Sequence, residues 1–150
     1  MRRVEGQGRV EAPPDEVFAY LADLDNLADW QSGIVTAERV DAGEMQVGSS
    51  ARVARQLMGQ RLEVPLTVSH YEPPSRLGIT SEASGVKVAA MLDLRPLDGG
   101  DATDLLFMME IRGSLMTAFM EPMIASAAKG DIDASIGRVQ ARFATGADPA

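Results

Sequence analysis

Cysteine is absent from the 150-residue sequence, and histidine occurs only once. The missing thiols exclude disulfides, cysteine-ligated zinc, iron–sulfur clusters and thiol catalysis. A single histidine excludes His-rich metal sites, so any histidine chemistry depends on His70 alone. The chain also lacks an apolar run of about 18 residues, which excludes a membrane-spanning helix over this sequence.

Positive charge is scarce as well. The 14 Lys and Arg residues face 22 Asp and Glu residues, which gives a net charge of −8. Such a chain repels phosphate backbones and anionic lipid surfaces, so we expect no nucleic-acid partner and no membrane insertion. The arginines at positions 2 and 3 are not followed by the apolar run of a signal peptide, and we expect a cytoplasmic protein.

Apolar and polar residues alternate along much of the chain, which is typical of strands with one buried face. The first such segment covers 4–11. Further strands are predicted over 34–40, 51–58, 61–71, 77–84, 86–95 and 103–112. Prolines, glycines and acidic residues separate them, as in hairpin turns.

Helical spacing replaces the alternation in two regions. Two short helices are predicted after the first strand, one over about 14–23 and one containing Leu27, Ala28 and Trp30. A long apolar stripe runs from Met116 to Phe143 and predicts a C-terminal helix. Pro122 lies inside it, so we expect a kink or a new helix start there. The small, polar residues 145–150 are expected to fray.

This order of elements predicts one α+β domain over 1–150. Hairpin-joined strands tend to curl, and a long helix with an apolar stripe must bury it. We therefore expect a curved antiparallel sheet of about seven strands wrapped around the C-terminal helix.

Several short motifs resemble the helix-grip (SRPBCC) superfamily, which includes START domains, and within it the polyketide cyclase/dehydrase-like branch. The first is the strand, Ala-Pro-Pro turn and short helix over residues 10–23, and the second is the short helix ending in Trp30. Later turns at 47–49, 71–77 and 94–100 also match, whereas Gly100-Asp101-Ala102-Thr103 departs from the usual Gly-Thr. The resemblance covers about 4–144 and implies a cavity between sheet and helix.

Candidate ligand-binding residues are those expected to face this cavity. The alternation places apolar side chains on the concave face, and methionines, which adapt to varied apolar ligands, recur on the helix. The candidates are Trp30, Leu66, His70, Leu92, Phe107, Met109, Met116, Phe119, Met120, Met123 and Ile124. The same methionine spacing also fits core packing, and Trp30 fits either a pocket lid or a core residue.

His70 and Arg55 are the weak catalytic candidates. His70 ends an alternating apolar strand and could act as a general base or hydrogen-bond a ligand, or be a half-exposed strand-end residue. Arg55 faces inward if Val53 does, and could then pair with a ligand carboxylate. In the opposite phase, with Ala54 and Met58 inward, Arg55 lies in solvent, and the pattern leaves both phases open.

These features favour a binding protein for a small hydrophobic molecule, of lipid, polyketide or aromatic type. The alternative is a cyclase or dehydratase of a polyketide-like substrate, whose cavity orients the chain while His70 or Arg55 polarises a carbonyl. A third reading is an interaction domain whose acidic surface meets a basic partner. No motif in the sequence points to a metal or a cofactor, and the pattern leaves a homodimer open.

Overall fold

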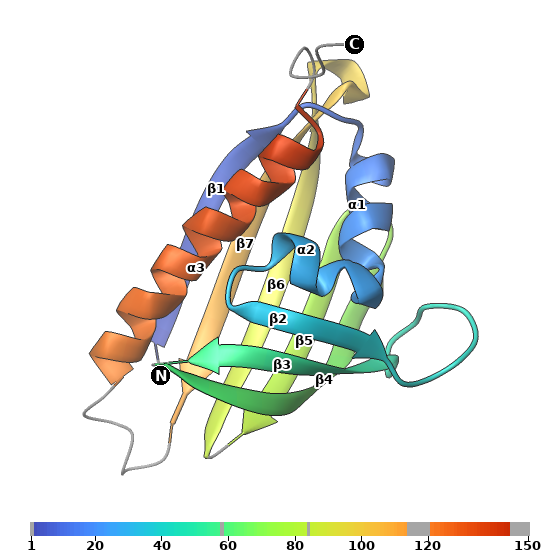
Figure 1. Cartoon of the computed structure of the whole chain (residues 1–150). Coiled ribbons are helices and arrows are strands. Elements are labelled where there is room, and N and C mark those ends of the chain that lie inside the picture. Colours follow the sequence, from blue (N-terminus) through green and yellow to red (C-terminus); the bar gives the residue numbers. More distant parts are fainter. Residues whose placement is uncertain (1, 58, 84, 114–120, 145–150) are drawn as a thin grey trace.

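The computed structural model describes residues 2–57, 59–83, 85–113 and 121–144 (Figure 1). The elements follow one another in the expected order. They are β1 (Arg2–Val10), α1 (Pro14–Ala22), the 3₁₀ helix η1 (Leu24–Asn26), α2 (Leu27–Trp30), β2 (Ile34–Arg39), β3 (Ser50–Leu57), β4 (Gln60–Glu72), β5 (Arg76–Ala83), β6 (Val86–Leu97), the 3₁₀ helix η2 (Asp98–Gly100), β7 (Ala102–Arg112) and α3 (Glu121–Arg142).

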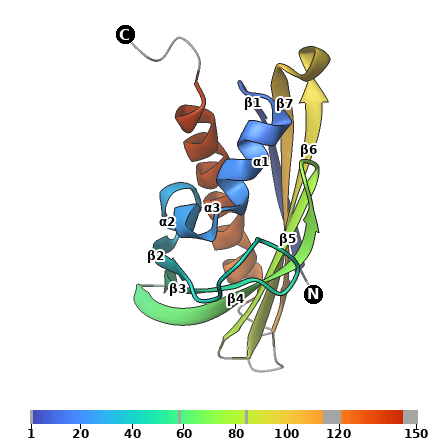
Figure 2. The same ribbon diagram turned by 90° about the vertical axis from the view of Figure 1, so that its right-hand side faces the viewer.

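The seven strands form one antiparallel sheet in the order β1-β7-β6-β5-β4-β3-β2. Strands β2 to β6 each pair with the next strand along the chain, and β1 pairs with β7. Burial alternates along β7, where Leu105, Phe107, Met109 and Ile111 are buried and the residues between them are half-buried. Figure 2 shows α1, α2 and α3 on the same side of this curved sheet. The predicted helix-grip fold is confirmed.

Two short elements follow β1 because prolines and acidic residues mark their starts. Pro14 occupies the first turn of α1, and Asp15 and Glu16 suit the positive end of the helix dipole. After α1, the Asp23 side chain accepts a hydrogen bond from the Asp25 backbone N–H at 3.1 Å. The second short helix is split, since the 3₁₀ turn η1 runs directly into α2, which ends at Trp30.

Helix α3 lies along β1 and β7 and is seated by two glycines of β1 (Figure 1). A Cβ atom at Gly6 would lie 2.7 Å from Ile132 Cγ2, and one at Gly8 would lie 2.6 Å from Ile136 Cγ2. Glycine therefore lets the helix approach the strand closely. Lys129 Nζ and Gln140 Nε2 donate to backbone carbonyls of β1 at 2.7 and 3.1 Å, which fixes the helix along the strand.

Pro122 is the second residue of α3 as the structure describes it, over Glu121–Arg142. The kink or new helix start expected at this proline depends on residues 114–120, which lie outside the described residues. The preceding part of the predicted apolar stripe, including Met116, Phe119 and Met120, lies outside the described residues. In the described parts of the chain, no helix is both long and apolar enough to cross a membrane.

The core fills the space between the sheet and the three helices. The buried side of α3 presents Ala125, Ala128, Ile132, Ile136 and Val139. Trp30 is 1% exposed, and its ring lies edge-on to Phe107 with centroids 6.0 Å apart. The Trp30 Nε1–H is buried without an acceptor among the residues that the structure describes.

Candidate functional site

A cavity of about 100 Å³ lies between the sheet and the N-terminal half of α3. Its walls are mainly apolar and come from β4, β6, β7 and α3: Leu62, Val64, Val86, Val88, Met109, Ile111, Ile124, Ala127 and Ala128. Its polar side chains are Arg55, Ser81 and Asp131. A smaller hollow of about 20 Å³ adjoins it, shares Arg55, Ser81, Val88 and Met109 with it, and adds Gln31.

Arg55 enters this cavity because of the register of β3. It lies opposite Ile34 of β2, which is buried, and opposite Leu62 of β4, which lines the cavity. The phase with Val53 inward is therefore the one observed. The sequence could not decide this because Val53 and Ala54 are both buried, at 1% and 2% exposure, although they point to opposite faces of the strand.

The Arg55 guanidinium is a largely uncompensated charge. Burial lowers the pKa of Arg55, and the carboxylate of Asp131 opposes this shift. Arg55 forms no hydrogen bond or ion pair with any residue in the described ranges. A cation in apolar surroundings without hydrogen-bonding partners raises the free energy of the folded state.

Asp131 is held in place by the turn between α2 and β2. Ser32 Oγ donates to Asp131 Oδ1 at 3.2 Å, and the Ser32 backbone N–H donates to Ser135 Oγ at 2.8 Å. Ser135 Oγ in turn donates to the Asp131 carbonyl at 2.6 Å. Gly33, at φ +93°, allows this approach, since a Cβ there would lie 3.2 Å from Asp131 Oδ2. The carboxylate thus lines the same cavity as Arg55 from the opposite side.

This arrangement suits a ligand with an apolar body and a polar head. The apolar walls can bury a hydrocarbon or aromatic group, and the guanidinium has five N–H donors that can hydrogen-bond the oxygens of a ligand. The carboxylate of Asp131 can accept a proton or a hydrogen bond from a ligand hydroxyl. Among the described residues, no group of three or more acidic or histidine side chains could hold a metal ion.

The predicted ligand-binding residues divide into three groups. Leu66, Met109 and Ile124 line the cavity or its smaller extension. Trp30, Leu92 and Phe107 are buried in the core beside it. Met123 is 59% exposed, on the outer side of α3, and Met116, Phe119 and Met120 lie outside the described residues.

The expectation that His70 faces the cavity is wrong. A β-bulge between Val68 and His70 shifts the register of β4 against β5, so that Val68 pairs with Ile79 but His70 pairs with Gly78. Ser69 and His70 consequently both reach the outer face of the sheet, and Tyr71 takes the inner position against Phe18, at a centroid distance of 5.6 Å. His70 is therefore separated from the cavity by the sheet itself.

Sequence reasoning missed Gln31, Ser81 and Asp131. Ser81 follows Leu77 and Ile79 at alternate positions, and Asp131 falls within the apolar stripe of α3 beside Ala128 and Ile132. A polar residue in phase with buried neighbours is a usable signal for a pocket group. Gln31 gives no such signal, because it directly follows a four-residue helix.

The family profile described as "Polyketide cyclase / dehydrase and lipid transport" matches residues 1–144. Comparison with curated protein sequences gave no match. Among solved structures, a START superfamily protein from Mycobacterium smegmatis is 15% identical, with a TM-score of 0.79 over 94% of this chain and 96% of that one. The Zhui aromatase/cyclase from Streptomyces sp. R1128 is 19% identical, with a TM-score of 0.70 over 94% of both chains. These two likenesses concern the fold. The profile match over nearly the whole length shows that the chain belongs to the polyketide cyclase/dehydrase and lipid transport family.

Proposed function

We propose that the protein binds a small, mostly apolar molecule between the sheet and α3, with an anionic or carbonyl oxygen of that molecule facing Arg55. The observation that carries this proposal is the Arg55 guanidinium, which lines an apolar cavity and has no hydrogen bond or ion pair with the described residues. A ligand oxygen there would form charge-assisted hydrogen bonds and offset the burial of the cation. The family's association with polyketides and lipids supports an apolar ligand.

The cavity volume limits the part of the ligand that fits. The main void measures about 100 Å³. An apolar cavity of about 150 Å³ is known to take up benzene, so a single aromatic ring or a short acyl chain is the appropriate size for probes. Larger ligands would have to extend beyond the space that the described residues enclose.

Paired probes test the role of the charge. We expect benzoate to bind more tightly than benzyl alcohol, and hexanoate more tightly than hexanol, in isothermal titration calorimetry. Replacing Arg55 by Met should weaken benzoate binding by roughly ten- to a hundredfold, because a hydrogen bond to a charged group contributes about 1.5–3 kcal/mol. Binding of the neutral alcohols should be unchanged or slightly tighter.

Arg52→Met is the matched control, since Arg52 is on the same strand but exposed on its other face. Benzoate affinity should be the same in this variant as in the parent protein. Equal affinity for acids and alcohols in the parent, or an Arg55→Met variant that keeps the preference for acids, would refute the assignment of Arg55.

A second candidate function is the dehydration or cyclisation of a keto compound. It is favoured by Asp131, which places a proton acceptor in the same cavity as the Arg55 cation. Arg55 could stabilise the negative charge that develops on a carbonyl oxygen, while Asp131 could accept the proton from the adjacent carbon. The protonated Asp131 could then return this proton to the β-hydroxyl as its C–O bond breaks, which releases water and restores the carboxylate. The likeness to the Zhui aromatase/cyclase also supports this candidate. His70 has no part in it, since it lies on the other face of the sheet.

The aldol adduct of benzaldehyde and acetone is a suitable substrate for this test, because loss of water gives a conjugated enone that absorbs in the near ultraviolet. Protein-dependent formation of the enone that is lost in Asp131→Asn would support an enzyme. Benzoate binding without any enone formation would leave the binding function alone standing.

A further inference from the structure

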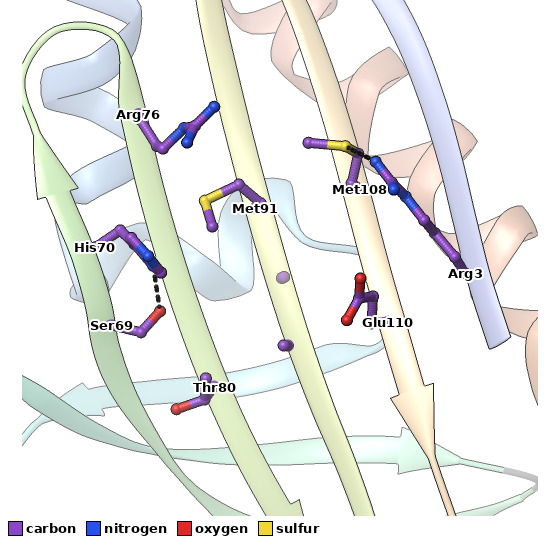
Figure 3. A pocket seen from close by; sticks show the side chains of 10 residues that line it. Arg3, Ser69, His70, Arg76, Thr80, Met91, Met108 and Glu110 are labelled. Carbon is purple, nitrogen blue, oxygen red and sulfur yellow. Dashed lines mark hydrogen bonds between the residues drawn. The ribbon is translucent and has the colours of Figure 1, made fainter. Parts of the chain in front are cut away.

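A groove runs along the outer face of the sheet, on the side away from the three helices. It consists of two adjoining hollows of about 360 and 260 Å³, which share Thr80, Ala89 and Glu110. Figure 3 shows the first hollow in front of the strands, with the helices behind them. The groove is therefore separate from the cavity that Arg55 lines.

Small residues in the middle strands make this face hollow. Cross-strand pairing aligns Gly78 of β5 with Met91 of β6 and Met108 of β7. A Cβ atom at Gly78 would lie 2.7 Å from both His70 Nδ1 and Ser69 Oγ, so the glycine lets these two side chains lie flat over β5. The half-buried methionines add an apolar surface that can adapt to an occupant.

Cationic side chains border the groove in a protein whose net charge is −8. Arg3, Arg76, Lys87 and Arg112 line its two hollows, together with His70, while Glu110 is the carboxylate that lines them. Arg76 is engaged by Asp93 at 2.7 Å, and Arg3 is 3.9 Å from Glu5 and contacts the Met108 sulfur. Arg3 also lies directly opposite Glu110, so the cations without an ion-pair partner are confined to the end of the groove at Lys87 and Arg112.

Lys87 and Arg112 provide the main evidence that the groove binds an anionic group. They lie directly opposite each other on β6 and β7. Lys87 also has Glu82 opposite it on β5, yet neither cation forms an ion pair with any residue in the described parts of the chain. Two like charges directly opposite each other destabilise the pairing of β6 with β7. An anionic group seated between them would offset the repulsion.

The shape of the groove selects the class of occupant. From Lys87 to Met91 the groove follows β6 over five residues, which is roughly 13 Å at about 3.3 Å per residue. It is an open trough rather than an enclosed pocket of the kind that buries most of a small ligand. An extended peptide of about five residues spans this length. A nucleic acid would bring a phosphate at every nucleotide against a chain that is acidic as a whole, whereas a peptide can place single carboxylates at Lys87 and Arg112 only.

We infer that this groove binds an acidic, extended peptide segment of a partner protein, with a carboxylate against Lys87 and Arg112 and its apolar side chains over Met91 and Met108. This binding is independent of the ligand proposed for the inner cavity.

The test uses a fluorescein-labelled decapeptide of alternating Glu and Leu and its Gln-and-Leu counterpart, measured by fluorescence anisotropy on the whole chain. The acidic peptide should bind at least about tenfold more tightly than the amide peptide. The double substitution K87E/R112E should remove this preference. Backbone amide shifts of β5, β6 and β7 should change on addition of the acidic peptide, as nuclear magnetic resonance would show.

Arg138→Glu is the matched control, because Arg138 is exposed on α3, on the other side of the sheet. It should leave the affinity for the acidic peptide unchanged. Equal binding of both peptides, an equal loss in Arg138→Glu, or full competition by free benzoate would overturn the inference. A loss caused by Arg55→Met would also overturn it, since that variant changes only the inner cavity. Far-ultraviolet circular dichroism of K87E/R112E checks that the fold is kept.

Discussion

The Arg55 guanidinium lies in apolar surroundings that disfavour its positive charge. The apolar walls of the cavity lower its pKa, and the described residues offer it no hydrogen bond. We expect Arg55→Met to raise the free energy of unfolding by about 1 kcal/mol, because methionine keeps the apolar stem and removes the buried charge. Urea denaturation measures this change. A loss of stability of similar size would mean that Arg55 supports the fold rather than ligand binding.

Asp41 is the residue with the clearest acid dependence. Arg39 and the Ser50 backbone N–H both donate to its carboxylate, and they lower the pKa of Asp41 from 3.8 to about 2. The folded state therefore holds fewer protons than the unfolded state between these values, and its stability falls as the pH falls through them. Asp41→Asn should be less stable than the parent at neutral pH, and the gap should close between about pH 4 and pH 2.

Chemical denaturation at a series of pH values tests this. A gap that stays constant down to about pH 2 would show that the contacts of Asp41 do not depend on its charge. Asp101→Asn is a suitable control, since Asp101 is exposed in the turn between β6 and β7.

Single residues also show where sequence reasoning stops. The alternation from Leu62 to Val68 extends by pattern to His70, but the bulge at Ser69 reverses the faces, and nothing in the local sequence announces it. Arg55 was undecided for a different reason, since its strand is buried on both faces at Val53 and Ala54. The position of Asp131 depends on its contact with Ser32, which is 99 residues away in sequence, so the sequence pattern could not predict it.

At the scale of elements, the strand and helix order followed from the sequence because each element has its own periodicity and its own turn residues. Strand bounds such as Ala102–Arg112 lie within a residue or two of the predicted 103–112. The fit of one element on another was not predictable in this way. Gly6 and Gly8 break the apolar alternation of β1, and only the approach of α3 explains why they are glycines.

The close packing of α3 on β1 predicts opposite changes in stability for Gly→Ala substitutions at two positions. Gly6→Ala should destabilise the protein by about 1–3 kcal/mol, because the new methyl group would lie 2.7 Å from Ile132 Cγ2 and 2.9 Å from Asp133 Oδ1. Gly137 lies in α3, where an added Cβ would have no neighbour within 4 Å, so Gly137→Ala should stabilise the protein by about 0.5–1 kcal/mol. Urea denaturation of both variants measures these changes. Similar effects at both glycines would mean that backbone propensity, not packing, decides.

For the whole molecule, one sheet presents two different surfaces. Alternate residues of β6 and β7 serve opposite sides, so Val88 and Met109 line the inner cavity while Met91 and Met108 border the outer groove. The sequence predicted the inner surface through its apolar residues. It gave no reason to expect the outer groove, because the cations that border it lie far apart in the chain and meet only through strand pairing.

The single tryptophan makes the molecule its own optical reporter. Trp30 is sealed in the core against Phe107, and its indole N–H meets no acceptor among the described residues. Its emission should therefore be blue-shifted in the folded protein and move to longer wavelengths in urea. If unfolding is two-state, this shift and the far-ultraviolet dichroism will coincide. A red-shifted emission without urea would show that water reaches the indole. Every stability change predicted above can then be followed by fluorescence without a label.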